Sequence, residues 1–466
     1  MALDPNEEGS EPIAKFESML KTDDVYFFDA EDFEDIIHHY LNNGKVSLAK
    51  KAIKIGLEQH PETTPLKLLE IEVLVFENKL DLAISQLDYL ESLDQKNEEI
   101  YIQRANIWSK QDKHLKAITC LEKALLLTED TLDIYALLGM EYLFLENFEK
   151  AKHNFIKCVE EDPQDYASLY NIIYCFEYLE DPDGAISYLN DYLENEPYCE
   201  VAWHQLGKQY KSTGLYKEAL TAFDFAIISD ESFIGAYFEK AMVLEKLKRY
   251  NEAIENYETT IDLEDPTAHA YLRIGRCHEK IGNSDLAQQY YYKTVHEDPL
   301  LDKGWLAITN FYIREKNFDK ALYYINKALH IDTENEAYWK KCAQINVSLG
   351  QLDEADFAYK QAVEFGDYDL NTWESWALVV MENKEFEAAN QILLQAIGFF
   401  PEVASLRYRL AFIFGLSQDI EQSKYHLSEA LRLDYSLLEH FKSQYPGFFN
   451  STWVSNFIRT SSKASS

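Results

Sequence analysis

Small and apolar residues recur along the chain every 34 residues. Steps of 34 from Ala49 reach an alanine at each position through Ala389, and the next step, to Ser423, breaks the series. The residue four positions after each of these is apolar every time, from Ile53 to Leu427. Because residues four apart lie on one face of a helix, this pattern predicts a repeated helix with one buried face.

A second set of positions marks another helix in each 34-residue unit. Most of the positions in step with Trp203 are aromatic, and most are followed four residues later by alanine or glycine. Small residues at such positions predict that two helices pack closely within the unit. Prolines such as Pro61 and Pro163 fall where the second helix must end. The aromatic positions are Phe33, Tyr101, Tyr135, Trp203, Tyr237, Tyr271, Trp305, Trp339 and Trp373.

Some units depart from this pattern. Lys67 and Leu169 replace the aromatic residue in the second and fifth units, and Ile37, Ile71 and Ile173 replace the small residue in the first, second and fifth units. A bulky side chain at a close helix contact holds the two helices apart, so we expect looser packing in the second and fifth units. Pro182 is expected in the hairpin turn of the fifth unit.

The segment from Trp203 to Phe223 carries a clear copy of the unit. The residues Trp203, Leu206, Gly207, Tyr210, Ala219 and Phe223 fit the spacing W-x2-L-G-x2-Y…A-x3-F. This spacing resembles the tetratricopeptide-repeat family, and the resemblance covers residues 30–434. It implies an all-α fold, a right-handed α-solenoid superhelix of about twelve 34-residue helix-turn-helix repeats with N- and C-terminal capping helices. It also implies that the first helix of each repeat lines a concave groove.

Three segments follow from this reading. Residues 1–29 form a polar arm, taken as disordered over residues 1–11, and a capping segment around Phe16; residues 30–434 form the tandem array. Residues 435–466 form a capping helix, an aromatic segment and a polar tail. Since the ends of a solenoid need covers, we expect the aromatic segment from Phe448 to Ile458 to cap the last hairpin. A docking peptide for a partner is the alternative.

The charge of the chain narrows the classes of partner. Its 466 residues hold 81 acidic and 44 basic side chains, a net charge of −37. Nucleic acid and anionic membrane surfaces both favour basic proteins, so neither is expected as a partner, and no membrane insertion is expected. The N-terminus lacks the basic and apolar regions of a secretory signal. These features predict an acidic, cytoplasmic protein, and they leave its oligomeric state open.

No motif for catalysis, a cofactor or a metal stands out. The glycines are isolated repeat positions rather than a phosphate-binding loop, and no H-E-x-x-H or G-x-S-x-G sequence occurs. The six cysteines include no C-x-x-C pair, so neither a zinc site nor a disulfide framework is indicated. The expectation is a protein that is not an enzyme and has no cofactor.

The family geometry allows the groove face of each first helix to be projected from the sequence. In units six to ten this projection gives ten basic residues against three acidic ones, Glu239, Glu245 and Glu279. We expect this lining to bind an acidic or carboxylate-bearing segment, although solvation or pairing of the charges is the alternative. The basic residues are Lys208, Lys211, Lys246, Arg273, Arg276, Lys280, Lys303, Arg314, Lys340 and Lys341.

Units one to five give a different projected lining. It is acidic at its edges, with Lys110 as its one base, and apolar between the acids. Exposed apolar groove residues mark binding sites, so an apolar or aromatic segment is the expected ligand. The apolar residues are Leu68, Phe76, Ile102, Met140, Phe144, Tyr170, Tyr174 and Tyr178.

These features predict a non-catalytic scaffold or adaptor that binds a partner protein or peptide in its groove. A regulatory or substrate-recruiting subunit of an enzyme complex is the alternative, since the same surface could hold an enzyme supplied by another chain. Fold alone does not decide between them.

Overall fold

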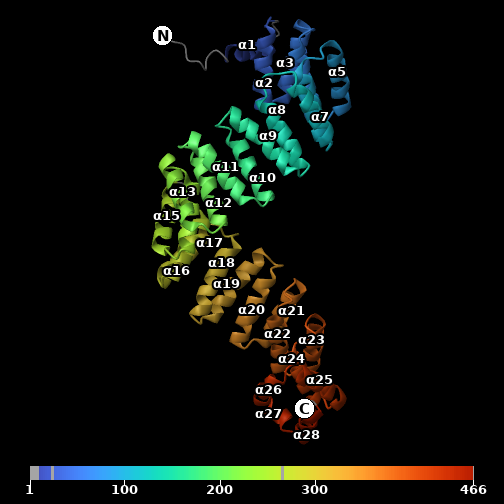
Figure 1. Ribbon diagram of the computed structural model, residues 1–466, viewed down its shortest axis with the longest axis vertical. Coiled ribbons are helices and arrows are strands. Elements are labelled where there is room, and N and C mark those ends of the chain that lie inside the picture. The colour runs from blue at the N-terminus through green and yellow to red at the C-terminus, as the bar shows by residue number, and fades with distance from the viewer. Residues whose placement is uncertain (1–9, 23–25, 264–266, 465–466) are drawn as a thin grey trace. The chain divides into compact units, whose positions relative to one another are not determined.

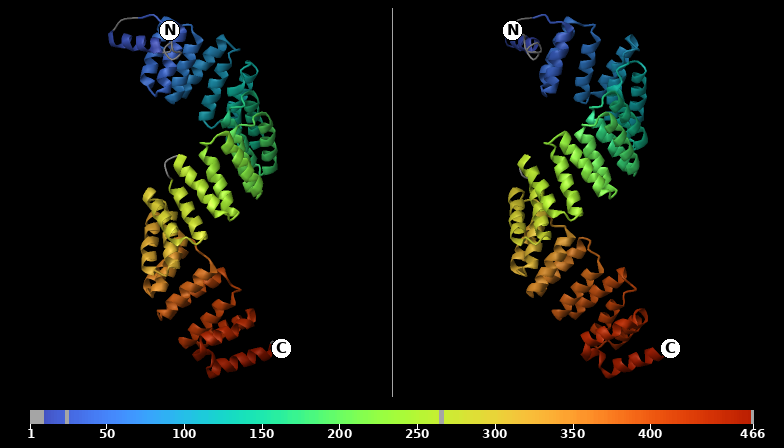
Figure 2. Two further views of the ribbon diagram at one scale, coloured as in Figure 1. Left: turned by 90° about the vertical axis from the view of Figure 1, so that its left-hand side faces the viewer. Right: turned by 60° about the vertical axis from the view of Figure 1, so that its left-hand side comes forward.

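The computed structural model describes residues 10–22, 26–263 and 267–464, and this part of the chain is helical without a strand (Figure 1). The chain divides into two compact units, unit 1 with residues 1–233 and unit 2 with residues 234–466. In each unit the helices stack as successive antiparallel pairs joined by short turns (Figure 2). The predicted all-α solenoid of helical hairpins is confirmed.

The helices of unit 1 run from α1 to α13. Their bounds are α1 (Ser10–Thr22), α2 (Ala30–Asn42), α3 (Val46–Gln59), α4 (Thr64–Phe76), α5 (Leu80–Leu93), α6 (Glu98–Lys110), α7 (His114–Leu125), α8 (Leu132–Phe144), α9 (Phe148–Glu161), α10 (Tyr166–Tyr178), α11 (Pro182–Asn195), α12 (Glu200–Ser212) and α13 (Tyr216–Ser229).

The helices of unit 2 run from α14 to α28. Their bounds are α14 (Ile234–Lys246), α15 (Tyr250–Leu263), α16 (Ala268–Lys280), α17 (Ser284–Glu297), α18 (Asp302–Arg314), α19 (Phe318–Ile331), α20 (Glu336–Leu349), α21 (Leu352–Glu364), α22 (Leu370–Glu382), α23 (Phe386–Phe399), α24 (Ala404–Leu416), α25 (Ile420–Leu433), the 3₁₀ turn Tyr435–Leu437, α26 (Leu438–Gln444), α27 (Pro446–Phe449) and α28 (Thr452–Ala464).

The repeated alanines lie at the contact between the two helices of each hairpin. Every one of them, from Ala49 to Ala389, is fully buried, and Ser423 is buried in the same way. A Cβ atom added at Gly207 would lie 2.5 Å from the ring of Phe223, and one at Gly275 would lie 2.7 Å from the ring of Tyr291. Glycine in the first helix therefore makes room for an aromatic ring from the second helix.

Two of the three hairpins with isoleucine at this contact pack less closely, whereas α2–α3, which carries Ile37, packs about as closely as α22–α23, which carries Ala377. Ile71 and Ile173 are both buried in their hairpins. The pairs α4–α5 and α10–α11 make the sparsest backbone contact among the hairpins α2 to α25. The looser packing predicted for the second and fifth units is thus confirmed.

Each hairpin turn contains one residue with a positive φ, again at a spacing of 34. Glycine holds this position at Gly44, Gly214, Gly282 and Gly350, whereas other residues, such as Glu180 with a φ of 53°, hold the rest. The prediction that Pro182 lies in the turn is wrong, because Pro182 is the first residue of α11. Proline fits this position because the first turn of a helix needs no donor from its N–H.

Both ends of the array are covered by helices. Ser10 and Glu11, expected to be disordered, already belong to α1, while the rest of the expected arm, residues 1–9, lies outside the described residues. Phe16 of α1 is fully buried against α2. At the other end, Phe448 and Phe449 are buried with Tyr408 of α24, so the aromatic segment folds as a cap. The segment boundaries at residues 29 and 434 stay a prediction.

Candidate interaction surfaces

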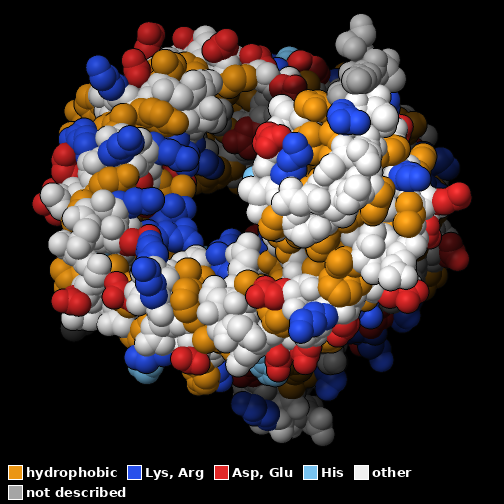
Figure 3. Space-filling model, turned by 90° about the horizontal axis from the view of Figure 1, so that it is seen from below, with side chains coloured by type: hydrophobic (Ala, Val, Ile, Leu, Met, Phe, Trp, Pro, Cys, Tyr) orange, Lys and Arg blue, Asp and Glu red, His pale blue; other side chains and the backbone are white. Residues whose placement is uncertain are grey.

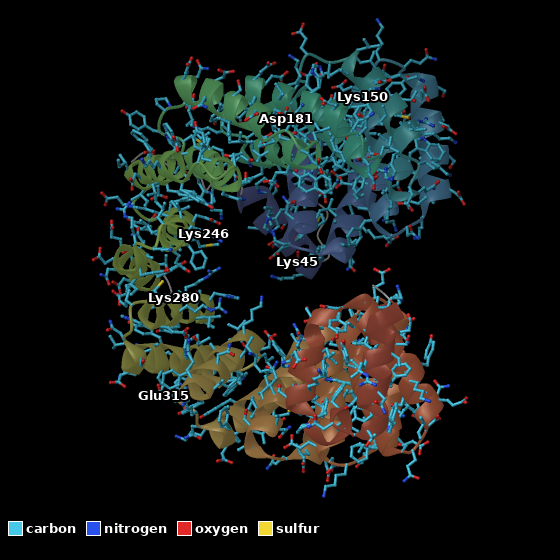
Figure 4. The ribbon with its side chains drawn as sticks, turned by 60° about the horizontal axis from the view of Figure 1, so that its bottom comes forward. Lys45, Lys150, Asp181, Lys246, Lys280 and Glu315 are labelled. Carbon is cyan, nitrogen blue, oxygen red and sulfur yellow. The ribbon has the colours of Figure 1, made fainter. Side chains whose placement is uncertain are left out.

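The first helices of three consecutive hairpins in unit 2 enclose a hollow of about 610 Å³. Figure 3 shows Lys and Arg side chains gathered on the left of the view. Figure 4 labels Lys246 and Lys280, which end α14 and α16. We call this hollow the basic groove; its charged lining residues are Glu245, Lys246, Arg273, Arg276, Glu279, Lys280 and Arg314.

Two arginines of the basic groove are held by glutamates from the neighbouring hairpin. Arg273 lies 3.5 Å from a carboxylate oxygen of Glu245, and Arg314 donates two hydrogen bonds to Glu279. Burial raises the pKa of the Glu279 carboxyl, but hydrogen bonds from Arg314 and Tyr291 outweigh it and hold the pKa below its usual value. Both arginines therefore form part of the wall, with their charge largely compensated.

Three cations of the basic groove have no such partner. Within the described residues, no ion pair joins Lys246, Arg276 or Lys280 to a carboxylate. Lys246 and Lys280 are exposed and Arg276 is half-buried. The amide of Asn310 lines the same hollow and adds a neutral hydrogen-bonding group. The basic groove thus presents uncompensated positive charge together with a polar donor.

The other predicted basic residues of unit 2 do not line this hollow. Lys340 pairs with Asp369 at 3.0 Å and with Asp367 at 3.3 Å, two acids in the loop before α22 that a projection of first helices does not include. Lys341 lines an adjoining hollow of about 300 Å³ with Arg314, and burial lowers the pKa of its ammonium group. Lys303 is exposed at the start of α18.

Lys208 and Lys211 belong to α12 in unit 1, and both are half-buried. Lys208 lines a different hollow from the one in unit 2. The expectation that these two lysines share one lining with Arg273 and Arg276 stays a prediction.

A second hollow of about 790 Å³ lies in unit 1 between α8, α10 and α12. Glu177 of α10 lines it and accepts a hydrogen bond from Gln209 at 3.3 Å. Leu68, which the sequence placed on the same kind of surface, is instead buried. We call this hollow the aromatic groove; its lining includes Met140, Phe144, Phe148, Tyr170, Tyr174, Tyr178, Glu146, Glu177, Gln205 and Lys208.

Acidic side chains continue from the aromatic groove along the first helices of unit 1. Burial raises the pKa of Glu99 above its usual value, although a hydrogen bond from Gln103 offsets part of the rise. The carboxylates of Glu72 and Asp133, on the preceding and following first helices, raise it further. These acids therefore repel one another on one side of unit 1.

All six cysteines are buried as free thiols. In the residues that the structure describes, no group of His, Cys, Asp and Glu is placed to hold a metal ion. No helix in that part of the chain is both long and apolar enough to cross a membrane.

Comparison with known families identifies the repeat. Models of the tetratricopeptide repeat match residues 132–165, which are α8 and α9 with their turns, and residues 238–301, which reach from α14 to α17. Both matches keep the 34-residue spacing that runs through the rest of the array. The chain belongs to the tetratricopeptide-repeat proteins.

Several known proteins resemble this chain. Anaphase-promoting complex subunit 3 of Schizosaccharomyces pombe is 30% identical over 140 residues, 30% of this chain and 21% of that protein, so the match spans about a fifth of its length. The crystal structure of the APC/C hetero-tetramer Cut9–Hcn1 has 15% identity and a TM-score of 0.38, covering 88% of this chain and 93% of that one. YrrB, described as a TPR protein with an unusual peptide-binding site, has 15% identity and a TM-score of 0.33, covering 42% and 97%.

The family sets a coarse functional class. Tetratricopeptide-repeat proteins bind protein or peptide partners and are generally non-catalytic scaffolds. A role in protein interaction follows for this chain.

Proposed function

We propose that this chain is a non-catalytic, cytoplasmic scaffold or adaptor that binds an acidic segment of a partner protein in the basic groove. The single observation that carries the proposal is the set of Lys246, Arg276 and Lys280, three cations that form no ion pair within the described part of a chain of net charge −37. The acidic surface of the protein repels an acidic segment, whereas the basic groove attracts it, so the electrostatic field directs the segment to the basic groove.

The wall of the groove supports the same ligand chemistry. Arg276 can hold a carboxylate with two parallel hydrogen bonds, while lysine acts as a mobile point charge. The Arg314–Glu279 and Arg273–Glu245 pairs keep the wall in place, since each joins helices of neighbouring hairpins. A carboxylate that enters therefore meets cations whose surroundings are already ordered, which lowers the entropy cost of binding.

A regulatory or substrate-recruiting subunit of an enzyme complex is the second candidate. This candidate is favoured by the similarity over 140 residues to anaphase-promoting complex subunit 3, a protein named as a subunit of a complex. Affinity purification of the full chain from its own cells distinguishes the two candidates. A stoichiometric enzyme among the bound proteins supports the second candidate, and bound proteins without an enzyme support the first.

Charge reversal tests the acidic ligand directly. The variant Lys246→Glu/Arg276→Glu/Lys280→Glu is compared with a control, Lys248→Glu/Lys316→Glu/Lys384→Glu, which changes the net charge equally. The control sites are exposed turn positions with positive φ, and glutamate already holds the equivalent positions at Glu146 and Glu180. Circular dichroism checks that both variants keep their helix content.

The probe is a fluorescent peptide of about ten residues that alternates glutamate and serine, titrated by fluorescence anisotropy. We expect the groove variant to weaken binding about 100-fold and the control about threefold, because only the groove variant replaces attraction by repulsion at the ligand. Equal weakening in both variants, or no binding to the native chain, contradicts the proposal.

A further inference from the structure

The aromatic groove exposes four aromatic rings in one hollow. Phe144 and Tyr178 are each 58% exposed, Tyr170 is 43% exposed and Tyr174 is 42% exposed. All four side chains line the same hollow. Exposed apolar surface of this kind marks a place where a partner docks.

These rings are held in place by contacts with one another. Tyr178 stacks on Phe148 of α9 with ring centres 4.7 Å apart, and the ring of Tyr174 lies 4.6 Å from that of Tyr178. The His114 ring stacks on Phe144 at 5.0 Å and is itself fixed by Glu141 at 2.9 Å. The groove therefore offers rings whose positions are set before a ligand arrives.

Elsewhere in unit 1, lysines of the chain cover aromatic faces. Lys150 lies 5.0 Å above the Tyr142 ring, Lys152 lies 4.4 Å above the Phe176 ring, and Lys116 lies 4.7 Å above Trp108. Within the described residues, no cation of the chain lies over Phe144, Tyr170, Tyr174 or Tyr178. His114 covers one face of Phe144 and Phe148 covers one face of Tyr178. The ring surface that stays exposed can attract a cation from a ligand through its quadrupole.

The acidic side chains beside the rings also attract a cation. Glu177 follows Tyr174 by three residues on α10, so it lies on the same face of the helix. Glu177 is exposed and, among the described residues, accepts a hydrogen bond from the neutral amide of Gln209 and forms no ion pair. Glu146 lines the groove as well, and Lys208 is the one base in its lining. A cation between Tyr174 and Glu177 gains from both the rings and the carboxylate.

We propose that the aromatic groove docks a partner segment that carries a lysine or arginine next to apolar side chains. The cation lies against the rings of Tyr174 and Tyr178 beside Glu177, and the apolar side chains cover Met140 and Phe144. This ligand differs in charge from the one proposed for the basic groove, so the two proposals stand or fall separately.

Selection from random peptides tests this chemistry without a known partner. A phage library of peptides of about twelve residues, which reach about 40 Å when extended, is selected on the full chain. Bound phage are then compared on the native chain and on Tyr174→Ala/Tyr178→Ala. The control is Tyr198→Ala, which removes a ring that is 80% exposed and lies outside the aromatic groove.

Some selected peptides should lose binding to Tyr174→Ala/Tyr178→Ala but still bind Tyr198→Ala. These peptides are expected to contain Lys and Arg about threefold or more as often as the unselected library. One such peptide, synthesised and labelled, is expected to bind about tenfold more weakly to Tyr174→Ala/Tyr178→Ala and about fivefold more weakly to Glu177→Gln, as for a partly desolvated cation–π site with a carboxylate. Replacement of its Lys or Arg by Gln is expected to weaken binding equally. Recovery of no groove-dependent peptide, or of peptides without basic enrichment or rich in Asp and Glu, overturns the proposal.

Discussion

The aromatic groove of unit 1 and the basic groove of unit 2 are built from equivalent positions of the repeat. Three 34-residue steps separate Phe144 from Lys246, Tyr174 from Arg276 and Tyr178 from Lys280. The same steps separate Glu177 from Glu279 and Met140 from Met242, and all of these residues line one hollow or the other. Each hollow uses the first helices of three successive hairpins. The backbone thus presents one set of positions twice, and the side chains alone change the ligand chemistry.

Glu177 and Glu279, which hold the same position of the repeat, show how the neighbours of a residue change its role. Glu279 is tied to Arg314 and Tyr291 and belongs to the wall of the basic groove. Glu177 has a weaker partner in Gln209 and faces an aromatic surface. A carboxylate at one repeat position therefore serves as support in unit 2, and in our proposal it serves as a ligand contact in unit 1.

Exchange of the three differing residues is expected to have the largest effect on this comparison. In the variant Phe144→Lys/Tyr174→Arg/Tyr178→Lys, the aromatic groove loses its rings and takes the charge of the basic groove. Binding of the cationic peptide is expected to fall about 100-fold, about 2.7 kcal/mol, and a second site for the acidic peptide is expected to appear, both measured by anisotropy.

The matching control adds the same charge to exposed sites outside the groove, as Leu93→Lys/Leu126→Arg/Tyr198→Lys. If this control gains the second site for the acidic peptide as well, net charge rather than position decides binding, and the comparison fails.

The next largest effect is expected from a packing change in unit 2 that weakens binding at the basic groove but not at the aromatic groove. Gly275→Val places a side chain where Tyr291 lies, within 2.7 Å of the added Cβ. Overpacking of this kind costs about 2 kcal/mol, and the displaced Tyr291 loosens Glu279, to which it donates a hydrogen bond at 2.6 Å. We expect a lower thermal unfolding midpoint and weaker binding of the acidic peptide, with binding of the cationic peptide unchanged.

Gly398→Ala is the matched control, because nothing lies within 4 Å of its added Cβ inside α23. It is expected to raise stability by up to about 0.5 kcal/mol, since alanine favours the helix. An equal loss of binding at both grooves in Gly275→Val would mean that the two units do not respond separately.

Salt is expected to affect the two grooves to different degrees. The basic groove depends on exposed charges, and these are screened as the Debye length shortens. When the ionic strength rises from about 0.05 M to about 0.5 M, the affinity for the acidic peptide is expected to fall about tenfold. The affinity for the cationic peptide is expected to fall about threefold, because ring contacts are less sensitive to salt. Equal salt dependence for the two peptides would argue against the aromatic contribution in unit 1.

A smaller effect is expected from removing the charge of one carboxylate in the wall of the basic groove, which should tighten binding of the acidic peptide. Glu279→Gln keeps an oxygen that can accept hydrogen bonds from Arg314 and Tyr291, so the wall keeps its support, while the local charge rises by one unit. Acidic peptide is expected to bind about threefold more tightly, about 0.7 kcal/mol, in the same anisotropy titration. Glu315→Gln serves as the control because Glu315, labelled in Figure 4, is exposed and lies outside the lining of the basic groove. A similar gain in the control would assign the effect to net charge.

The smallest expected effect concerns the acids of unit 1. Because the folded-state pKa of Glu99 is raised, the stability that this shift contributes is present at low pH and is lost as the pH rises through the raised pKa. The charged carboxyl thus costs stability at neutral pH. Glu99→Gln is expected to stabilise unit 1 by about 0.5 kcal/mol near pH 7 and to give no gain near pH 4, as measured by thermal unfolding at both values. A gain that does not depend on pH would exclude charge repulsion as its cause.

The repeat itself could be predicted from the sequence in detail. Alanine every 34 residues identifies the tight contact in each hairpin. The second and fifth hairpins pack less closely, as predicted, but isoleucine alone does not identify them, because Ile37 holds the same position in α2–α3 without such an effect. The left-handed turn residue could not be predicted in the same way. Its position is constant, but Asn78, Asp112, Lys248 and Gln418 occupy it as well as glycine, because an exposed turn tolerates the strain that a buried one would not.

The charges show where prediction from the sequence ends. Pairing of the basic groove residues with acids such as Glu279 was the alternative to ligand binding. In the structure Glu279 pairs with Arg314, 35 residues away, and Lys340 pairs with Asp369, 29 residues away. Neither partner lies on the same helix as the residue it holds.

The amino-acid sequence by itself determined that this protein is an array of helical hairpins, because close contacts recur at a fixed spacing and admit few residue types. Which cations stay without a partner, and which rings stay uncovered, was decided by the tertiary structure. The physical reason is the reach of the two kinds of interaction: packing inside a hairpin depends on residues close in sequence, whereas ion pairs and ring contacts join neighbouring hairpins and depend on how the helices stack.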